Sequence, residues 1–91
     1  MKLIIESGST KTDWRSVADD GKVIGFRTSG INPLLQSEDD IRSVMAKAIP
    51  EVNPQGRTVD EVFFYGAGVL SPAFAEPLVS LLATWCPLAR I

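Results

Sequence analysis

The sequence predicts an α/β fold in which one lobe is built on a mixed β-sheet. Two short runs, residues 3–5 and 62–65, are apolar at every position, which is typical of strands covered on both faces. An Asp-Gly pair within residues 19–21 predicts a tight hairpin between two further strands. Helical periodicity in residues 38–49 and in the segment after Pro72 indicates two helices. The predicted order is therefore strand, strand, strand, helix, strand, helix.

The first thirty residues predict an antiparallel meander of three strands. The first strand covers residues 3–5. The second and third strands, residues 11–18 and 22–29, flank the Asp-Gly turn, where both central positions are expected to take positive φ. In the third strand larger residues alternate with Gly25 and Arg27, which predicts a half-buried edge strand. The inward residues of that strand are expected to be Ile24, Phe26 and Thr28.

The first helix has sequence signals at both ends. Ser37 is expected to cap it, the acidic residues 38–40 suit the positive end of the helix dipole, and Pro50 is expected to end it. Its apolar residues recur at i, i+3, i+4, i+7 and i+8, so they form one stripe that is expected to face the core. These residues are Ile41, Val44, Met45, Ala48 and Ile49.

The second helix has two alternative starts, because Pro77 lacks the backbone N–H that a helix interior uses. Either the helix begins at Pro72 and kinks at Pro77, or its regular part begins around Ala75 with Pro77 in the first turn. The Cys86-Pro87 pair is expected to end it, with Cys86 as an inert core residue. Residues 88–91 are predicted to begin a further strand.

The strand over residues 61–65 is expected to run parallel to the first strand, since both are apolar and favour central positions in the sheet. Parallel strands end at the same edge, so the loops over residues 7–10 and 66–68 are predicted to lie side by side. Open α/β sheets bind ligands at that edge. The chain ends where a fifth strand is expected to start. We therefore expect residues 1–91 to form one lobe, truncated before the fifth strand, of a longer two-lobed protein.

Composition and charge exclude several classes of function. The 91 residues include no histidine and one cysteine, which rules out a Ser-His-Asp triad, a His-ligated zinc site and an intrachain disulfide. The net charge is −2 and the nine Lys and Arg residues form no run, so nucleic acid is not expected as a partner. No stretch has the length of a secretory or membrane-spanning segment. These features predict a cytoplasmic protein that acts without a membrane.

The loop after the first strand is the best candidate for a binding site. Small residues after a buried strand can direct several backbone N–H groups to one side, and this loop adds four hydroxyls and one lysine. Phosphate groups need such a cradle, and the carboxylate of Glu6 beside it is placed to hold Mg²⁺ directly or through water. Spacing alone leaves a second interpretation open, a hairpin turn with solvated hydroxyls. The loop consists of Glu6, Ser7, Gly8, Ser9, Thr10, Lys11 and Thr12.

Residues 3–14, LIIESGSTKTDW, resemble the first phosphate motif of the actin, sugar-kinase and Hsp70 superfamily. They are similar in particular to the branch of BadF/BadG/BcrA/BcrD-type ATPases and N-acetylglucosamine kinases, whose members carry a D-x-G-x-T-K-T loop. The hairpin turn at residues 20–22, the loop at residues 28–33 and the strand end at residues 64–68 match the same family in order. The resemblance covers essentially the whole chain.

The resemblance implies an RNase H-like lobe with the strand order 3-2-1-4-5, which closes with a second lobe over ATP and an amino sugar. It implies that the loop binds ATP phosphates with Mg²⁺. The family usually has Asp where this chain has Glu6, and the longer side chain favours a metal contact through water. The implied nucleotide-binding residues are Gly8, Ser9, Thr10, Lys11 and Thr12. The implied sugar-side residues are Asn32, Gly66, Ala67 and Gly68, although Asn32 before Pro33 also suits a simple turn.

Three functions follow from the resemblance. The first is ATP-dependent phosphorylation of an N-acetylated amino sugar, with this chain supplying the first phosphate loop and part of the sugar cleft. The second is an ATPase that activates a partner enzyme, and the third is a non-catalytic fragment. A homodimer is compatible with this family. No catalytic residue is expected within the chain, because the family's catalytic aspartate and adenosine-binding segment would lie beyond Ile91, so the 91 residues alone are expected to be inactive.

Overall fold

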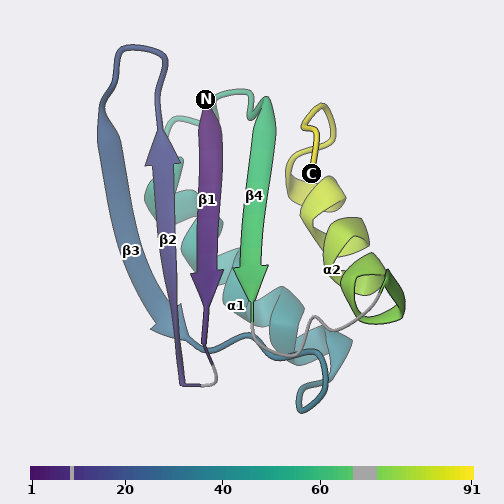
Figure 1. Cartoon of the computed structure of the whole chain (residues 1–91). Coiled ribbons are helices and arrows are strands. Elements are labelled where there is room, and N and C mark those ends of the chain that lie inside the picture. Colours follow the sequence, from purple (N-terminus) through teal and green to yellow (C-terminus); the bar gives the residue numbers. More distant parts are fainter. Residues whose placement is uncertain (9, 67–71) are drawn as a thin grey trace.

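The computed structural model contains four strands and two helices, in the predicted order (Figure 1). It describes residues 1–8, 10–66 and 72–91, in the last segment with side chains from residue 75 on. The elements are β1 (Lys2–Ser7), β2 (Lys11–Val17), β3 (Val23–Ser29), α1 (Glu38–Val52), β4 (Glu61–Gly66) and α2 (Pro72–Trp85).

The sheet has the strand order β3-β2-β1-β4. The pairs β1–β2 and β2–β3 are antiparallel, so the predicted meander is confirmed. Strand β4 pairs with β1 in parallel, as expected from their shared apolar character. Beyond β4, Arg90 forms a single parallel bridge with Glu61, in which the Val62 amide donates to the Arg90 carbonyl over 2.9 Å. The expectation that residues 88–91 begin to pair as a strand is met at this one position.

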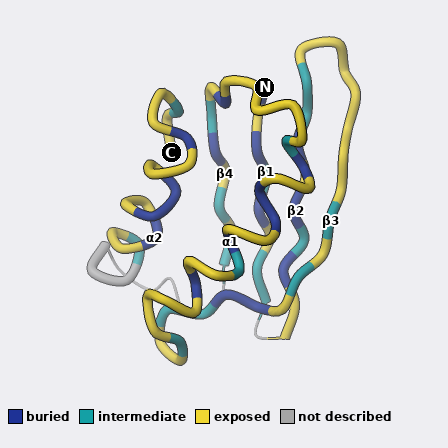
Figure 2. Tube along the Cα trace, turned by 180° about the vertical axis from the view of Figure 1, so that it is seen from behind, coloured by how far each residue is buried: buried dark blue, intermediate teal, exposed yellow. Residues whose placement is uncertain are grey.

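Helix α1 lies across one face of the sheet, and α2 lies beside β4 and contacts α1 (Figures 1 and 2). Ser37 caps α1 in a capping box with Asp40, as predicted. The core forms between the helices and the covered face of the sheet, where one residue in two along β1 and β2 is buried. Its largest fully buried side chains include Trp14, Ile5, Met45 and Leu82.

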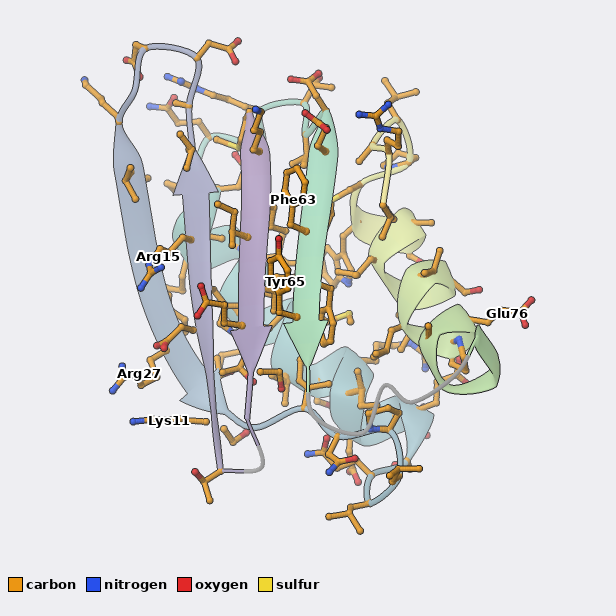
Figure 3. All side chains as sticks on the ribbon, in the orientation of Figure 1. Lys11, Arg15, Arg27, Phe63, Tyr65 and Glu76 are labelled. Carbon is orange, nitrogen blue, oxygen red and sulfur yellow. The ribbon has the colours of Figure 1, made fainter. Side chains whose placement is uncertain are left out.

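The two apolar runs are not covered on both sides, so that part of the prediction is wrong. In β4, Val62 is buried, but Phe63 and Tyr65 are 37% and 61% exposed. In β1, Ile4 between its buried neighbours is only half-buried. The physical reason is that α1 covers only one face of the sheet, and strand side chains alternate between the two faces. Figure 3 shows Phe63 and Tyr65 on the face opposite α1.

The edge strand and its hairpin also differ from expectation. Only Gly21 of the hairpin has positive φ, 86°. Its amide donates to the Ala18 carbonyl, so it is the last residue of the turn 18–21, and the left-handed residue follows the two central positions. In β3, Phe26 and Thr28 are half-buried as predicted, but Ile24 is 40% exposed.

Pro50 lies inside α1 and does not end it, which corrects the predicted helix end. A proline in the last turns removes one hydrogen bond, whereas continuing the helix buries Val52 fully. The Asn53 amide, which donates to the Ile49 carbonyl over 2.9 Å, closes the helix instead.

Helix α2 begins at Pro72 and continues through Pro77, so the start at Pro72 is confirmed, whereas the kink at Pro77 stays a prediction. It ends before Cys86, whose amide donates to the Leu82 carbonyl. The Cys86 thiol is buried in the core, as predicted, and burial raises its pKa. Within the described ranges, neither helix has the length and apolarity needed to cross a membrane.

Candidate functional site

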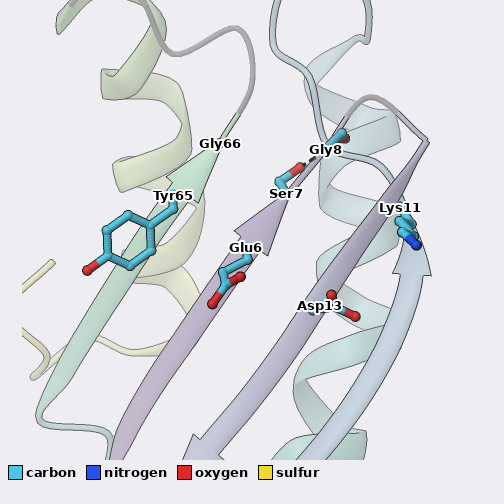
Figure 4. A pocket seen from close by; sticks show the side chains of 7 residues that line it. All are labelled: Glu6, Ser7, Gly8, Lys11, Asp13, Tyr65 and Gly66. Atoms are coloured by element: carbon cyan, nitrogen blue, oxygen red, sulfur yellow. Dashed lines mark hydrogen bonds between the residues drawn. The ribbon is translucent and has the colours of Figure 1, made fainter.

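A cavity of about 650 Å³ opens at the carboxyl ends of β1 and β4, on the sheet face that α1 leaves uncovered. Two carboxylates, one lysine, one aromatic ring and two glycines meet there (Figure 4). It is lined by Glu6, Ser7, Gly8, Lys11, Asp13, Tyr65 and Gly66.

Strand pairing explains why these residues meet. In the parallel pair Ser7 lies opposite Gly66, and in the antiparallel pair Ser7 lies opposite Thr12. The ends of β1 and β4 and the start of β2 therefore share one edge, as the sequence predicted. The predicted residues Ala67 and Gly68 fall outside the described part of the chain, as does Ser9 in the first loop.

The loop after β1 is a tight hairpin whose amide groups are partly used internally. The Gly8 N–H donates to the Lys11 carbonyl over 2.8 Å, so this amide closes the turn and does not point into a cradle. A Cβ at Gly8 would lie 3.4 Å from the same carbonyl oxygen, at the short end of ordinary van der Waals contact. Thr10 is exposed at the tip of the turn.

Two hydroxyls predicted as ligand donors bind the protein itself. Ser7 Oγ donates to the Ile31 carbonyl over 2.6 Å and accepts the Ile31 amide over 2.9 Å. Thr12 Oγ1 donates to Ser7 Oγ over 3.2 Å, and Thr12 is fully buried. Ser7 and Thr12 thus fasten the loop after β3 to the end of β1. In this arrangement the Thr12 side chain lies apart from the cavity, and its predicted phosphate contact stays a prediction.

Asn32 follows this fastened position directly and lies in a braced turn. Its Oδ1 accepts the Leu34 amide over 3.0 Å, and its own backbone N–H donates to Gln36 Oε1 over 2.7 Å. Gln36 Nε2 in turn donates to the Gly30 carbonyl over 2.9 Å. The turn interpretation of Asn32 is therefore confirmed. Its Nδ2 has no acceptor among the residues that the structure describes, so this donor is available to a ligand.

The charges of the cavity come from neighbouring strands. Glu6 and Asp13 are direct cross-strand partners, and both face the open side of the sheet. Arg27 Nε donates to the Asp13 carboxylate over 2.7 Å and holds the pKa of that carboxyl below its usual range. Glu6 lies 3.6 Å from Arg15, a looser ion pair.

Lys11 is exposed at the rim of the cavity, where Figure 3 shows it extending away from the sheet. Over residues 1–8, 10–66 and 72–91 it forms no ion pair. Its ammonium group is thus the cation of this cavity that an incoming anion can reach without breaking an existing pair.

The carboxylates suit a magnesium ion that is also held by a nucleotide. Magnesium commonly binds one or two carboxylates together with phosphate oxygens and several waters. Glu6 and Asp13 supply such a pair, whereas no cluster of three or more ligand side chains occurs among the described residues. The residues present therefore fit Mg²⁺ as a companion of a bound phosphate, with Glu6, the less tightly paired carboxylate, as the predicted contact.

Sequence reasoning missed Asp13 and Tyr65 as cavity residues. Asp13 was not among the predicted site residues, yet it lines the cavity, because the pairing of Ser7 with Thr12 places Asp13 directly opposite Glu6. The alternation of Lys11, Asp13 and Arg15 was a usable signal for this. Tyr65 was assigned to a strand covered on both faces, so it was not considered as a cavity residue.

The mixed sheet with its meander, parallel fourth strand and site at the carboxyl edge defines the class: an α/β lobe of the actin-like ATPase fold. Among solved structures, the chain is similar to a protein of Porphyromonas gingivalis named as a putative N-acetylglucosamine kinase. The two share 37% identity over 98% of this chain, with a TM-score of 0.83. The resemblance to the N-acetylglucosamine kinase-like group that the sequence indicated is thereby confirmed.

This chain spans 31% of the length of that protein. No protein-family model matches the chain, and no curated protein matches it.

Proposed function

We propose that this chain is the phosphate-binding lobe of a longer ATP-dependent kinase that phosphorylates an N-acetylated amino sugar. The observation that carries the proposal is the reachable cation of Lys11 beside the Glu6–Asp13 pair, at the joined ends of β1 and β4. The structural similarity to a protein named as a putative N-acetylglucosamine kinase supports the choice of reaction and substrate.

In this proposal, the nucleotide's phosphates lie at the hairpin after β1. Phosphoryl transfer relies mainly on positioning and on neutralising charge, and Lys11 supplies a compact positive charge at the rim. The remaining predicted contacts are Gly8, Ser9, Thr10 and Thr12. The Gly8 amide serves the turn in the structure, so we assign Gly8 the role of keeping the turn tight enough for phosphates to approach its backbone.

Glu6 would hold Mg²⁺ through water, with Asp13 beside it. When bound, Mg²⁺ would neutralise charge on the transferred phosphoryl group. The ion pair of Glu6 with Arg15 is long, so the Glu6 carboxylate can turn toward a cation at small cost. Asp13 is fixed by Arg27, and its negative charge adds to the field at the same place.

The acceptor sugar would lie at the end of β4, near the loop that carries Asn32, although Asn32 is not among the residues that line the cavity. Asn32 Nδ2 would donate to a sugar hydroxyl, and the small residues Gly66, Ala67 and Gly68 would let the ring approach the backbone closely. Ser7 keeps the Asn32 turn beside the phosphate loop, because it binds both polar groups of Ile31. The group that takes the proton from the hydroxyl would come from outside these 91 residues.

The test uses the complete polypeptide that carries this chain, with ATP, Mg²⁺ and a panel of N-acetylated sugars. We expect ADP release that depends on one of these sugars, together with formation of its phosphate ester. The same assay without sugar is the control. Equal ADP release with and without every sugar would contradict the kinase proposal and favour an ATPase that acts on a partner. The 91 residues alone are expected to give no turnover.

A further inference from the structure

Tyr65 is the one aromatic residue among those that line the cavity. Its side chain is 61% exposed, and its hydroxyl has no hydrogen-bond partner in the part of the chain that the structure describes. The next residue along β4 is Gly66, which also lines the cavity. An exposed flat ring next to an opening is suited to lie against a ligand.

The neighbours of Tyr65 divide the cavity into zones of different chemical character. Tyr65 pairs with Glu6 in the parallel register, and Glu6 pairs with Asp13 on its other side. Figure 4 shows Tyr65 at one side of the cavity and Lys11 at the other, with Glu6 and Asp13 between them. One side is therefore apolar and flat, the middle is acidic, and the far side carries a positive charge.

This arrangement fits a ligand that has a C–H face, hydroxyls and an attached or incoming phosphate. A pyranose ring presents C–H groups on one face and hydroxyls around its edge. Carboxylates accept hydrogen bonds from hydroxyls, and the ring of a tyrosine covers C–H groups with large apolar area at a small entropic cost. A nucleotide's phosphates belong on the opposite, lysine side.

We propose that Tyr65 is the stacking wall of the acceptor side of this cavity and that it selects a pyranose whose C–H groups lie together on one face. The proposal rests on the kinase function above and assigns the sugar its position relative to the phosphate loop. Tyr65 acts here through ring contact, so its phenol hydroxyl is dispensable and its aromatic face is not.

Phe63 provides a matched control on the same strand. It lies two residues before Tyr65 and on the same face, it is also exposed, and it is absent from the residues that line the cavity. A Phe63 variant removes a similar ring from the same sheet face without touching the proposed wall. Any general effect of removing an aromatic side chain from this sheet face should appear in both the Phe63 and the Tyr65 variants.

The experiment measures kinetics of the complete polypeptide with N-acetylglucosamine and ATP, and binding of N-acetylglucosamine by calorimetry without nucleotide. We expect Tyr65→Ala to raise the KM and the Kd for the sugar about tenfold, with the KM for ATP unchanged. The sugar KM and Kd of Tyr65→Phe should stay near the wild-type values. Those of Tyr65→Leu should lie between the wild-type and Tyr65→Ala values, since leucine keeps apolar volume without a flat ring. Phe63→Ala should leave both sugar constants unchanged.

Several outcomes would overturn the proposal. They are a Tyr65→Ala sugar KM within twofold of wild type, a rise in the KM for ATP instead, an equal loss in Tyr65→Phe, or an equal loss in Phe63→Ala. Sugar binding without turnover, weakened by Tyr65→Ala, would retain the wall and remove the kinase function. Turnover with sugar constants that ignore Tyr65 would retain the kinase and remove the wall. Neither binding nor turnover by the wild type would remove both.

Discussion

The two faces of the sheet are built from the same strands, and they differ in what covers them. On the face under α1, Leu3, Ile5 and Trp14 are buried in the core. On the open face, their neighbours Glu6 and Asp13 line the cavity or carry exposed charge. Because strand side chains alternate, successive residues along β1 or β2 lie in turn on the buried core face and on the open face that carries the cavity.

The polar residues of the two faces also behave differently. On the covered face Ser16 is buried, and its Oγ donates to the Val52 carbonyl over 2.6 Å, so the hydroxyl joins the sheet to the end of α1. On the open face Arg15 and Arg27 form ion pairs at the surface, where solvent screens them. The difference teaches that substitutions on the covered face should change stability, and those on the open face should change ligand use.

The largest expected effect is on the covered face. Trp14→Ala should lower the free energy of unfolding by about 3–5 kcal/mol, because it leaves a cavity in the core. It also removes the hydrogen bond from Trp14 Nε1 to Thr28 Oγ1 at 2.8 Å. Urea denaturation followed by circular dichroism measures this. Trp85→Ala, at a side chain that is 39% exposed, is the matched control and should lower the free energy of unfolding much less. Equal losses at both positions would contradict the assignment of the core.

Next in size is an effect on the open face that leaves stability unchanged. Lys11→Ala in the complete polypeptide should reduce kcat/KM for ATP by the equivalent of about 1.5–3 kcal/mol, the cost of losing a charge-assisted contact. Steady-state kinetics with varied ATP measures it. Lys47→Ala, at an exposed position of α1, should have no effect. Unchanged ATP kinetics for Lys11→Ala would remove the loop from nucleotide binding.

The end of β4 gives a prediction with a smaller expected effect, which depends on steric contact at Gly66. A Cβ at Gly66 would collide with the ring of Phe64, so Gly66→Ala should lower the free energy of unfolding by about 1–3 kcal/mol. Thermal or urea unfolding checks it. At Gly25 the nearest atom to a Cβ, the Trp14 carbonyl oxygen, is 3.9 Å away, so Gly25→Ala is the matched control with ample space. A Gly66→Ala chain as stable as wild type would show that the Phe64 ring moves aside freely.

The smallest expected effect depends on pH and concerns the Asp13–Arg27 pair. Arg27 lowers the pKa of Asp13, so the pair stabilises the folded state above the unfolded-state pKa of the carboxyl. That contribution is lost as the pH falls through the lowered folded-state pKa. A double-mutant cycle of Asp13→Asn and Arg27→Gln, built from free energies of unfolding, should therefore show a coupling energy at pH 7 that vanishes in acid. Coupling that grows toward acid pH would contradict the sign.

Much of the local structure could be predicted because it depends on near neighbours. The cap at Ser37 requires a hydroxyl and an acidic residue three positions later, and both are visible in the sequence. The hairpin at residues 19–21 was predicted from its Asp-Gly pair, although only Gly21, and not both central residues, takes positive φ. The end of α1 could not be predicted in this way, since the burial of Val52 outweighs the hydrogen bond that Pro50 lacks.

The candidate site was predicted in part. The loop from Glu6 to Lys11 was identified by its small and charged residues, and the structure brings these two residues into one cavity. The internal use of the Thr12 hydroxyl and the Gly8 amide could not be predicted, because both depend on partners that the turn geometry selects.

By itself, the sequence determined the order of strands and helices, the parallel placement of β4 and the edge of the sheet where polar loops meet, because alternation, capping and turn chemistry act over a few residues. The tertiary structure decided which face of each strand is open to solvent. That choice depends on where α1 lies across the sheet, and it leaves Tyr65, Glu6 and Asp13 on the open face. A strand's period fixes which residues share a face, but only the packing of a helix decides which of the two faces is buried.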